Sequence, residues 1–213
     1  LLSFLSANCQ EVEAEFNEIS KKYTFAKRFN IEMKVNLYQG SDDESPAQTL
    51  MSRAKRDNNN YYREDFSIIS INNDQGFLIT IDEVKKEICI EKQFGNDSDV
   101  ESPLDIVTNE EISFKPVEEV GEFKVYETNS IEMHNISSIR VFVNESGFFH
   151  KIDYRYFDNE GIIFQKVEVV FLKTQLNENF DTNCFDMNTY VQGKNGEYTG
   201  IGKYKDYRIV QSY

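Results

Sequence analysis

The pattern of apolar positions begins as a helix and then changes to a strand. Val12, Phe16, Ile19 and Tyr23 recur at spacings of four, three and four residues, which places them on one helical stripe. Over residues 29–37 apolar and polar side chains alternate, and this period is typical of a strand with one buried and one wet face. The sequence therefore predicts an amphipathic helix that leads directly into a strand.

The alternating pattern returns along most of the remaining chain. Polar turn segments at residues 72–76, 144–147 and 158–161 connect neighbouring apolar runs and predict hairpins. Residues 104–114 predict a short helix or a linker. Further strands are predicted at residues 50–56, 66–71, 77–81, 87–91, 123–126, 139–143, 148–157 and 162–172, with more strand and turn in the tail. The fold class is therefore α+β, a wide curved antiparallel sheet (half-barrel) of about nine to eleven strands, with an N-terminal helix and a possible short second helix on its concave face.

Composition and charge narrow the possible partners. The chain has 213 residues, with 37 acidic against 23 basic side chains and a net charge of −14. Such a charge repels phosphate backbones, so we expect no nucleic-acid partner. The longest apolar run is shorter than the roughly 20 residues that a membrane-spanning helix needs. Aromatic residues make up 14% of the chain, which indicates an ordered domain with a core.

The first ten residues resemble the end of an export signal. Residues 1–7 are apolar and then small, and charge begins at Glu11. One interpretation is a relaxed lipobox over residues 5–9, in which Cys9 is lipidated; another is cleavage after Cys9; a third is that the apolar residues start the helix itself. We expect residues 1–10 to be a signal remnant or lipobox region, residues 11–213 to form a single half-barrel domain, and the protein to be exported to the periplasm or tethered to the outer membrane.

The polar residues give no catalytic or metal-binding motif. The chain has only two histidines, and neither has a local pattern that would pair it with Cys89 or Cys184. The acidic segments 41–44 and 96–101 lack the ligand spacing of an EF-hand loop. We therefore predict no catalytic residue, no metal, no cofactor and no enzymatic activity.

The arrangement resembles the lipoprotein-carrier superfamily of the Lol type. The helix at residues 12–23 leads into the strand at residues 29–37, and residues 76–82 with Lys85 and Lys86 look like that family's strand–Asp–turn–strand hairpin. Residues 202–210 also look like the closing strand of exported Bacteroidetes envelope proteins. The resemblance implies an exported half-barrel with helices across an apolar face, and it implies binding of an apolar ligand or an acylated protein.

The candidate binding site is the apolar face that the alternating strands would share with the helix. If the helix covers this face fully, the face is an ordinary core; if a gap remains, it is a pocket for an apolar ligand. The alternative function is an accessory subunit or immunity-type protein, whose acidic surface binds a basic protein partner in the envelope. The residues of the candidate face are Phe16, Phe29, Ile31, Met33, Val35, Phe77, Ile79, Ile81, Val169 and Phe171.

Overall fold

A computed structural model shows how these patterns fold. It describes residues 14–92, 107, 112–128, 135–158, 161–194 and 197–212, so Cys9 and the other residues of the predicted export region lie outside the described part. The chain divides into two compact units, which are described separately below. The first contains Leu1–Ala26, Glu32–Met51 and Pro103–Thr174, and the second contains Lys27–Ile31, Ser52–Ser102 and Gln175–Tyr213.

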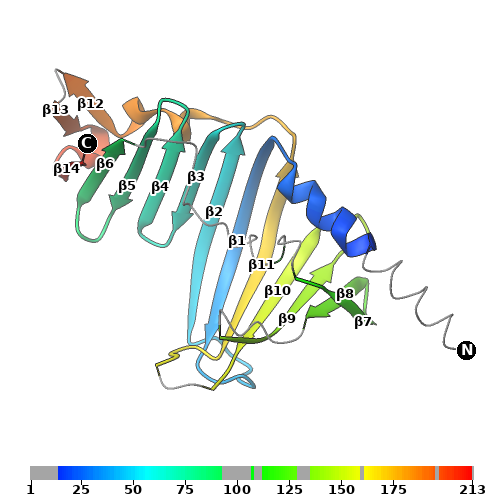
Figure 1. The fold of residues 1–213 in the computed structure, drawn as a ribbon. Coiled ribbons are helices and arrows are strands. Elements are labelled where there is room, and N and C mark those ends of the chain that lie inside the picture. Colours follow the sequence, from blue (N-terminus) through cyan, green and yellow to red (C-terminus); the bar gives the residue numbers. More distant parts are fainter. Residues whose placement is uncertain are drawn as a thin grey trace, which may run out of the picture. The chain divides into compact units, whose positions relative to one another are not determined.

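Twelve strands form one hydrogen-bonded order, β14-β6-β5-β4-β3-β2-β1-β11-β10-β9-β8-β7 (Figure 1). Its members are β1 (Arg28–Tyr38), β2 (Gln48–Asp57), β3 (Asn60–Asp65), β4 (Ile68–Asn73), β5 (Phe77–Asp82), β6 (Glu87–Lys92), β7 (Lys115–Val120), β8 (Phe123–Thr128), β9 (Ile136–Val143), β10 (Phe149–Tyr156), β11 (Lys166–Leu176) and β14 (Arg208–Ser212). Short turns make consecutive strands antiparallel, whereas β14 pairs with β6 in parallel. The strands β12 (Val191–Lys194) and β13 (Glu197–Gly200) form a separate two-stranded sheet.

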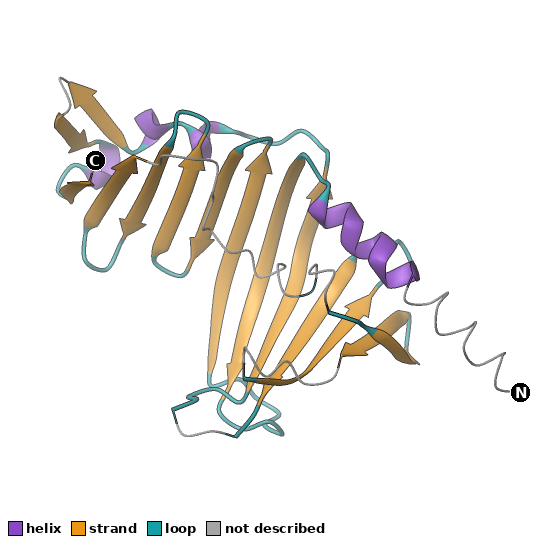
Figure 2. Cartoon of the chain, viewed as in Figure 1, coloured by secondary structure: helices purple, strands orange, loops and turns teal. Residues whose placement is uncertain are grey.

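The first unit combines a helix with strands from the β7 end of this order. The helix is described over residues 14–24, and the strands are β7 to β10 with most of β11 and parts of β1 and β2 (Figure 2). Alternate residues of the central strands, among them Ile139, Val141 and Ile152, are fully buried. The predicted helix is confirmed where the structure describes it, and the buried stripe of the helix forms part of this core.

The second unit has a hydrophobic cluster of its own beneath the C-terminal segment. That segment contains the short 3-10 helices η2 (Asn183–Phe185), η3 (Met187–Thr189) and η4 (Gly202–Tyr204). Phe185 of η2, Tyr204 of η4 and Tyr190, which directly follows η3, pack with isoleucines of β4, β5 and β6. The predicted meander of strands is confirmed, and the C-terminal segment supplies its apolar cover.

Several elements differ from the sequence-based prediction. The strands β3 and β7 were not predicted, and Phe66 lies in a turn between β3 and β4 although it was predicted to start a strand. Adjacent Tyr61 and Tyr62 are both buried, so β3 does not show the alternation by which other strands were recognised. Residues 104–114 of the possible second helix lie largely outside the described residues.

Candidate functional site

The N-terminal helix presents one apolar stripe to the first unit. Phe16, Ile19 and Tyr23 are buried, whereas the neighbouring positions on the other side of the helix are exposed or half-buried. On the exposed side Lys21 forms an ion pair with Glu18 at 2.9 Å, one turn earlier. The helical period thus positions three large side chains over the strands, as the sequence predicted.

These side chains meet aromatic residues from three different segments. The ring of Phe16 stacks on Phe114 at 4.4 Å between centroids and lies 5.0 Å from Tyr126 on β8. Tyr23 stacks almost parallel on Phe149 of β10, also at 4.4 Å, and Phe149 contacts Phe171 of β11 at 6.0 Å. We call this set, Phe16, Tyr23, Phe114, Tyr126, Phe149 and Phe171, the aromatic layer. Its members are all buried.

Polar contacts connect the start and the end of the described helix to the strands. The hydroxyl of Tyr23 accepts a hydrogen bond of 2.8 Å from the backbone N–H of Phe149. Lys22 donates to the carbonyl of Gly147 at 3.2 Å, and Gly147 has a φ of 71°, in the left-handed region that favours glycine. Near the start of the described helix, Glu15 forms an ion pair with Lys124. Burial raises the pKa of Tyr23 far above its ordinary value, so this hydroxyl stays neutral.

The predicted site residues are divided between the two units. In the first unit Phe16 and Phe171 belong to the aromatic layer, and Val169 pairs with Ile152 of β10. Met33 is buried in this unit and Val35 is half-buried. In the second unit Ile79 and Ile81 belong to the cluster beneath the C-terminal segment, with Phe77 packed against it. Phe29 and Ile31 are also buried in the second unit, where Phe29 contacts Tyr61 at 6.1 Å.

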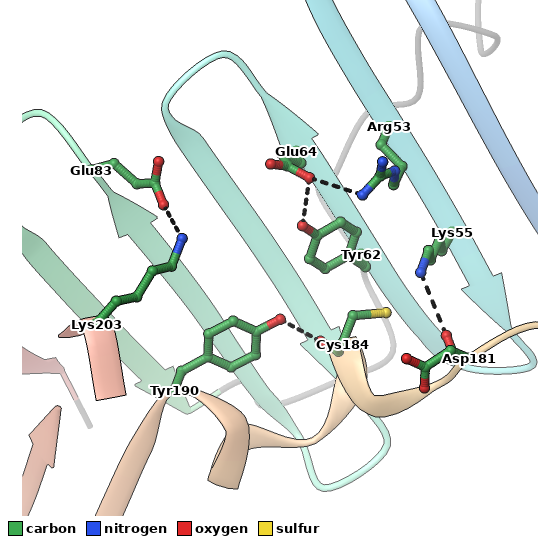
Figure 3. A network of polar contacts seen from close by, with 9 residues as sticks. All are labelled: Arg53, Lys55, Tyr62, Glu64, Glu83, Asp181, Cys184, Tyr190 and Lys203. Atoms are coloured by element: carbon green, nitrogen blue, oxygen red, sulfur yellow. Dashed lines mark hydrogen bonds and ion pairs between the residues drawn. The ribbon is translucent and has the colours of Figure 1, made fainter. Parts of the chain in front are cut away.

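The second unit carries a set of polar contacts around its hydrophobic cluster (Figure 3). Tyr62 donates to Glu64 at 2.8 Å, and Arg53 lies 3.7 Å from the same carboxylate. Tyr190 donates to the backbone carbonyl of Cys184 at 3.0 Å. These contacts satisfy phenol groups at the rim of an apolar core, which is a structural role.

The two described cysteines are free thiols. Burial raises the pKa of the Cys184 thiol, and burial together with a hydrogen bond to Glu91 raises that of Cys89. A raised pKa reduces the thiolate fraction on which cysteine nucleophilicity depends. The raised pKa therefore disfavours the thiolate form at both cysteines.

A second polar cluster lies on β10 and β11 of the first unit. The ammonium group of Lys151 is 3.0 Å from Asp153 and 3.4 Å from Glu168, and Asn36 donates to Glu168 at 2.6 Å. Burial raises the pKa of Asp153 in spite of the nearby lysine. Burial also acts to raise the pKa of Glu168, but the hydrogen bond from Asn36 and the charge of Lys151 outweigh it and the pKa is lowered. Sequence reasoning missed this cluster, because only cross-strand register brings these alternating polar residues together.

Two kinds of site are absent from the part of the chain that the structure describes. Among these residues, no three His, Cys, Asp or Glu side chains lie close enough together to hold a metal ion. No described helix has the length and apolar character needed to cross a membrane.

Comparisons with known proteins give matches among solved structures alone. No protein-family model matches the chain, and no curated protein matches it. One matching structure is an outer membrane lipoprotein-sorting protein domain from Vibrio parahaemolyticus, at 10% identity, with 81% of this chain and 97% of that chain covered and a TM-score of 0.38. A DUF1329 family protein from Desulfovibrio piger matches at 9% identity over 84% of this chain and 98% of its own, with a TM-score of 0.40.

A LolA superfamily protein from Nitrosomonas europaea also matches, at 10% identity over 85% of this chain and 98% of its own, with a TM-score of 0.36. Two of these three structures are described as lipoprotein-sorting or LolA-superfamily proteins, the kind of protein that the chain resembles by its sequence pattern. Matches at these identities and TM-scores carry no argument about what this chain binds or does.

Proposed function

We propose that the protein is a non-enzymatic, carrier-like binding protein of the cell envelope that holds an apolar ligand, such as an acyl chain, beneath its N-terminal helix. The binding surface would be the aromatic layer together with Met33 and Val169. Export, and a lipid anchor at Cys9, belong to the same proposal and are supported by the apolar and small residues of positions 1–9.

The observation that carries the proposal is the kind of contact between helix and strands. The described contacts are aromatic stacks, the Tyr23 and Lys22 hydrogen bonds and the Glu15–Lys124 ion pair. The free energy of the aromatic and aliphatic contacts comes mainly from the apolar area they bury, so an apolar ligand that covers the same area can replace them, whereas water cannot. The polar contacts at the edge of this area must break when the helix moves.

Replacement of the helix contacts by ligand contacts costs less free energy than exposure of the same apolar surface to solvent. Full exposure of Phe16, Ile19 and Tyr23 would cost about 1.5–3 kcal/mol for each side chain, or roughly 5–9 kcal/mol together. An empty open state is therefore rare. A ligand that covers the same surface recovers most of this free energy, so binding of an apolar molecule and displacement of the helix are coupled.

A crosslink that holds the helix in place tests the proposal. Glu15 and Lys124 are replaced by cysteine in a variant with Cys9, Cys89 and Cys184 changed to serine, and the new pair is joined by a short bismaleimide. We expect the open variant to bind cis-parinaric acid, seen as a rise in its fluorescence, and the crosslinked variant to bind it at least about tenfold more weakly.

A crosslink within the helix provides the matched control. Cysteines at Glu18 and Lys21 lie one helical turn apart, so their crosslink restrains no movement between helix and strands. This variant should bind the probe like the open protein. Equal probe binding by the helix-to-strand crosslinked variant, or no binding by the open one, would refute the proposal. Native mass spectrometry that finds a basic protein in place of a lipid would favour the alternative function.

A further inference from the structure

The hairpin between β3 and β4 places a large aromatic residue in an unfavourable conformation. Asp65 pairs with Ile68, so Phe66 and Ser67 alone form the loop. Phe66 has a φ of 59°, which is the left-handed region that glycine adopts readily and a bulky side chain does not. Folding does not compensate this strain by burying the ring, because 53% of the residue is exposed.

A second exposed apolar residue lies in the next turn at the same end of the strands. Val84, in the turn between β5 and β6, is 79% exposed. The backbone N–H of Glu83 donates to the carbonyl of Ser67 at 2.8 Å, so the two turns are in direct contact. Figure 1 shows both turns at the lower end of β3 to β6. We use the name turn surface for these two turns together with a neighbouring C-terminal segment. It consists of Phe66, Ser67, residues 82–87 and residues 202–208.

Residues 202–208 contact the second turn through ion pairs and a backbone hydrogen bond. Lys203 forms an ion pair with Glu83 at 2.6 Å, and the backbone N–H of Arg208 donates to the carbonyl of Lys86 at 2.9 Å. Arg208 also forms an ion pair with Glu87. The turn surface is therefore one connected part of the second unit.

The charge of the turn surface differs from that of the chain. It contains five basic and four acidic side chains, a net charge of +1, whereas the whole chain carries −14. Three of the four acids are paired with bases of the same surface: Asp82 with Lys85, Glu83 with Lys203 and Glu87 with Arg208. The negative charge of the rest of the chain repels an anionic surface, but such a surface can approach the turn surface.

We propose that the turn surface docks the protein on an anionic lipid surface. Phe66 and Val84 would enter the boundary between headgroups and acyl chains, and the lysines beside them would lie at headgroup level. Exposed apolar residues on turns, in a surface that also carries basic side chains, combine insertion of apolar groups with attraction to anionic headgroups, which together give weak peripheral binding. The exposed Phe66 then contributes to membrane contact, whereas its strained backbone contributes nothing to the stability of the fold.

This proposal goes beyond the carrier function and does not depend on it. The turn surface lies in the second unit, whereas the aromatic layer lies in the first. The helix-to-strand crosslink should leave membrane docking unchanged, and a variant of the turn surface should leave probe binding unchanged.

Co-sedimentation with vesicles of phosphatidylethanolamine and phosphatidylglycerol tests the docking proposal. All proteins in this assay carry Cys9→Ser, so that no lipid anchor can bind the vesicles. We expect the protein with the wild-type turn surface to sediment with these vesicles and Phe66→Gly to lower its partition coefficient by about tenfold or more. Glycine suits the positive φ, so this variant should stay folded, with an unchanged circular dichroism spectrum and no lower midpoint of urea unfolding.

Phe25→Ser is the matched control, since Phe25 is 69% exposed and lies outside the turn surface. This variant should sediment like the wild type. The proposal is overturned if the wild-type protein does not bind the vesicles, if Phe66→Gly binds as well as the wild type, or if Phe25→Ser loses as much binding as Phe66→Gly. Wild-type binding that disappears when phosphatidylglycerol is omitted supports the role of the basic side chains, and equal binding without it contradicts that role.

Discussion

Replacement of Phe16 by alanine is the most direct test of the aromatic layer. Phe16 is 2% exposed and contacts three other rings, Phe114 at 4.4 Å, Tyr126 at 5.0 Å and Phe149 at 6.2 Å. Loss of a buried phenylalanine side chain removes its transfer free energy and leaves a cavity. The usual cost is about 3–5 kcal/mol in free energy of unfolding.

The measurement is urea unfolding at pH 7, followed by circular dichroism and by tyrosine fluorescence. We expect Phe16→Ala to lower the midpoint strongly with little change in slope. Phe25→Ala, at an exposed position that follows the same helix, should change the free energy of unfolding by no more than about 0.5 kcal/mol.

Rescue by a small aromatic molecule provides an independent readout of the same cavity. Benzene at a free concentration ten times its dissociation constant for the cavity should raise the free energy of unfolding of Phe16→Ala by about 1.4 kcal/mol. It should leave that of Phe25→Ala unchanged. A loss below about 1 kcal/mol in Phe16→Ala, or equal losses in the two variants, would show that the helix does not pack on the strands through this ring.

Three further predictions concern buried polar groups. Tyr23→Phe removes the acceptor of the Phe149 N–H and should cost about 1–3 kcal/mol in urea unfolding; an unchanged midpoint would contradict the hydrogen bond. Lys151→Met leaves Asp153 and Glu168 without their shared cation and should cost about 1–3 kcal/mol, and adding Asp153→Asn should restore part of the loss, whereas additive losses would exclude the coupling. Stability should fall as the pH rises above about 10, because buried tyrosines keep their protons in the folded state while the unfolded chain releases them; urea midpoints that stay level from pH 9 to pH 11 would refute this. The tyrosines whose pKa burial raises most are Tyr23, Tyr62, Tyr126 and Tyr190.

Local periodicity was sufficient for the elements whose two faces differ in polarity. Alternation over residues 29–37 identified β1, and the spacing of Phe16, Ile19 and Tyr23 identified the buried stripe of the helix. It failed for β3, where Tyr61 and Tyr62 are buried on both faces and the period disappears.

Pairing between distant segments decided the rest. The two-residue turn that places Phe66 at positive φ follows from the register of β3 and β4, and hydrophobicity alone assigned this residue to a strand. The parallel pairing of β14 with β6 joins segments more than 100 residues apart, and no local pattern specifies it.

The sequence by itself determined a wide, mostly antiparallel sheet preceded by an amphipathic helix, because burial on one face of an element leaves a period in the chain. Only the tertiary structure decided which residues meet. It joined Phe16 to Phe149 and Lys151 to Glu168, and it brought the turn that holds Phe66 into contact with the turn that holds Val84. The physical reason is that a contact depends on register and on the path of the chain between elements, and neither leaves a mark on local composition.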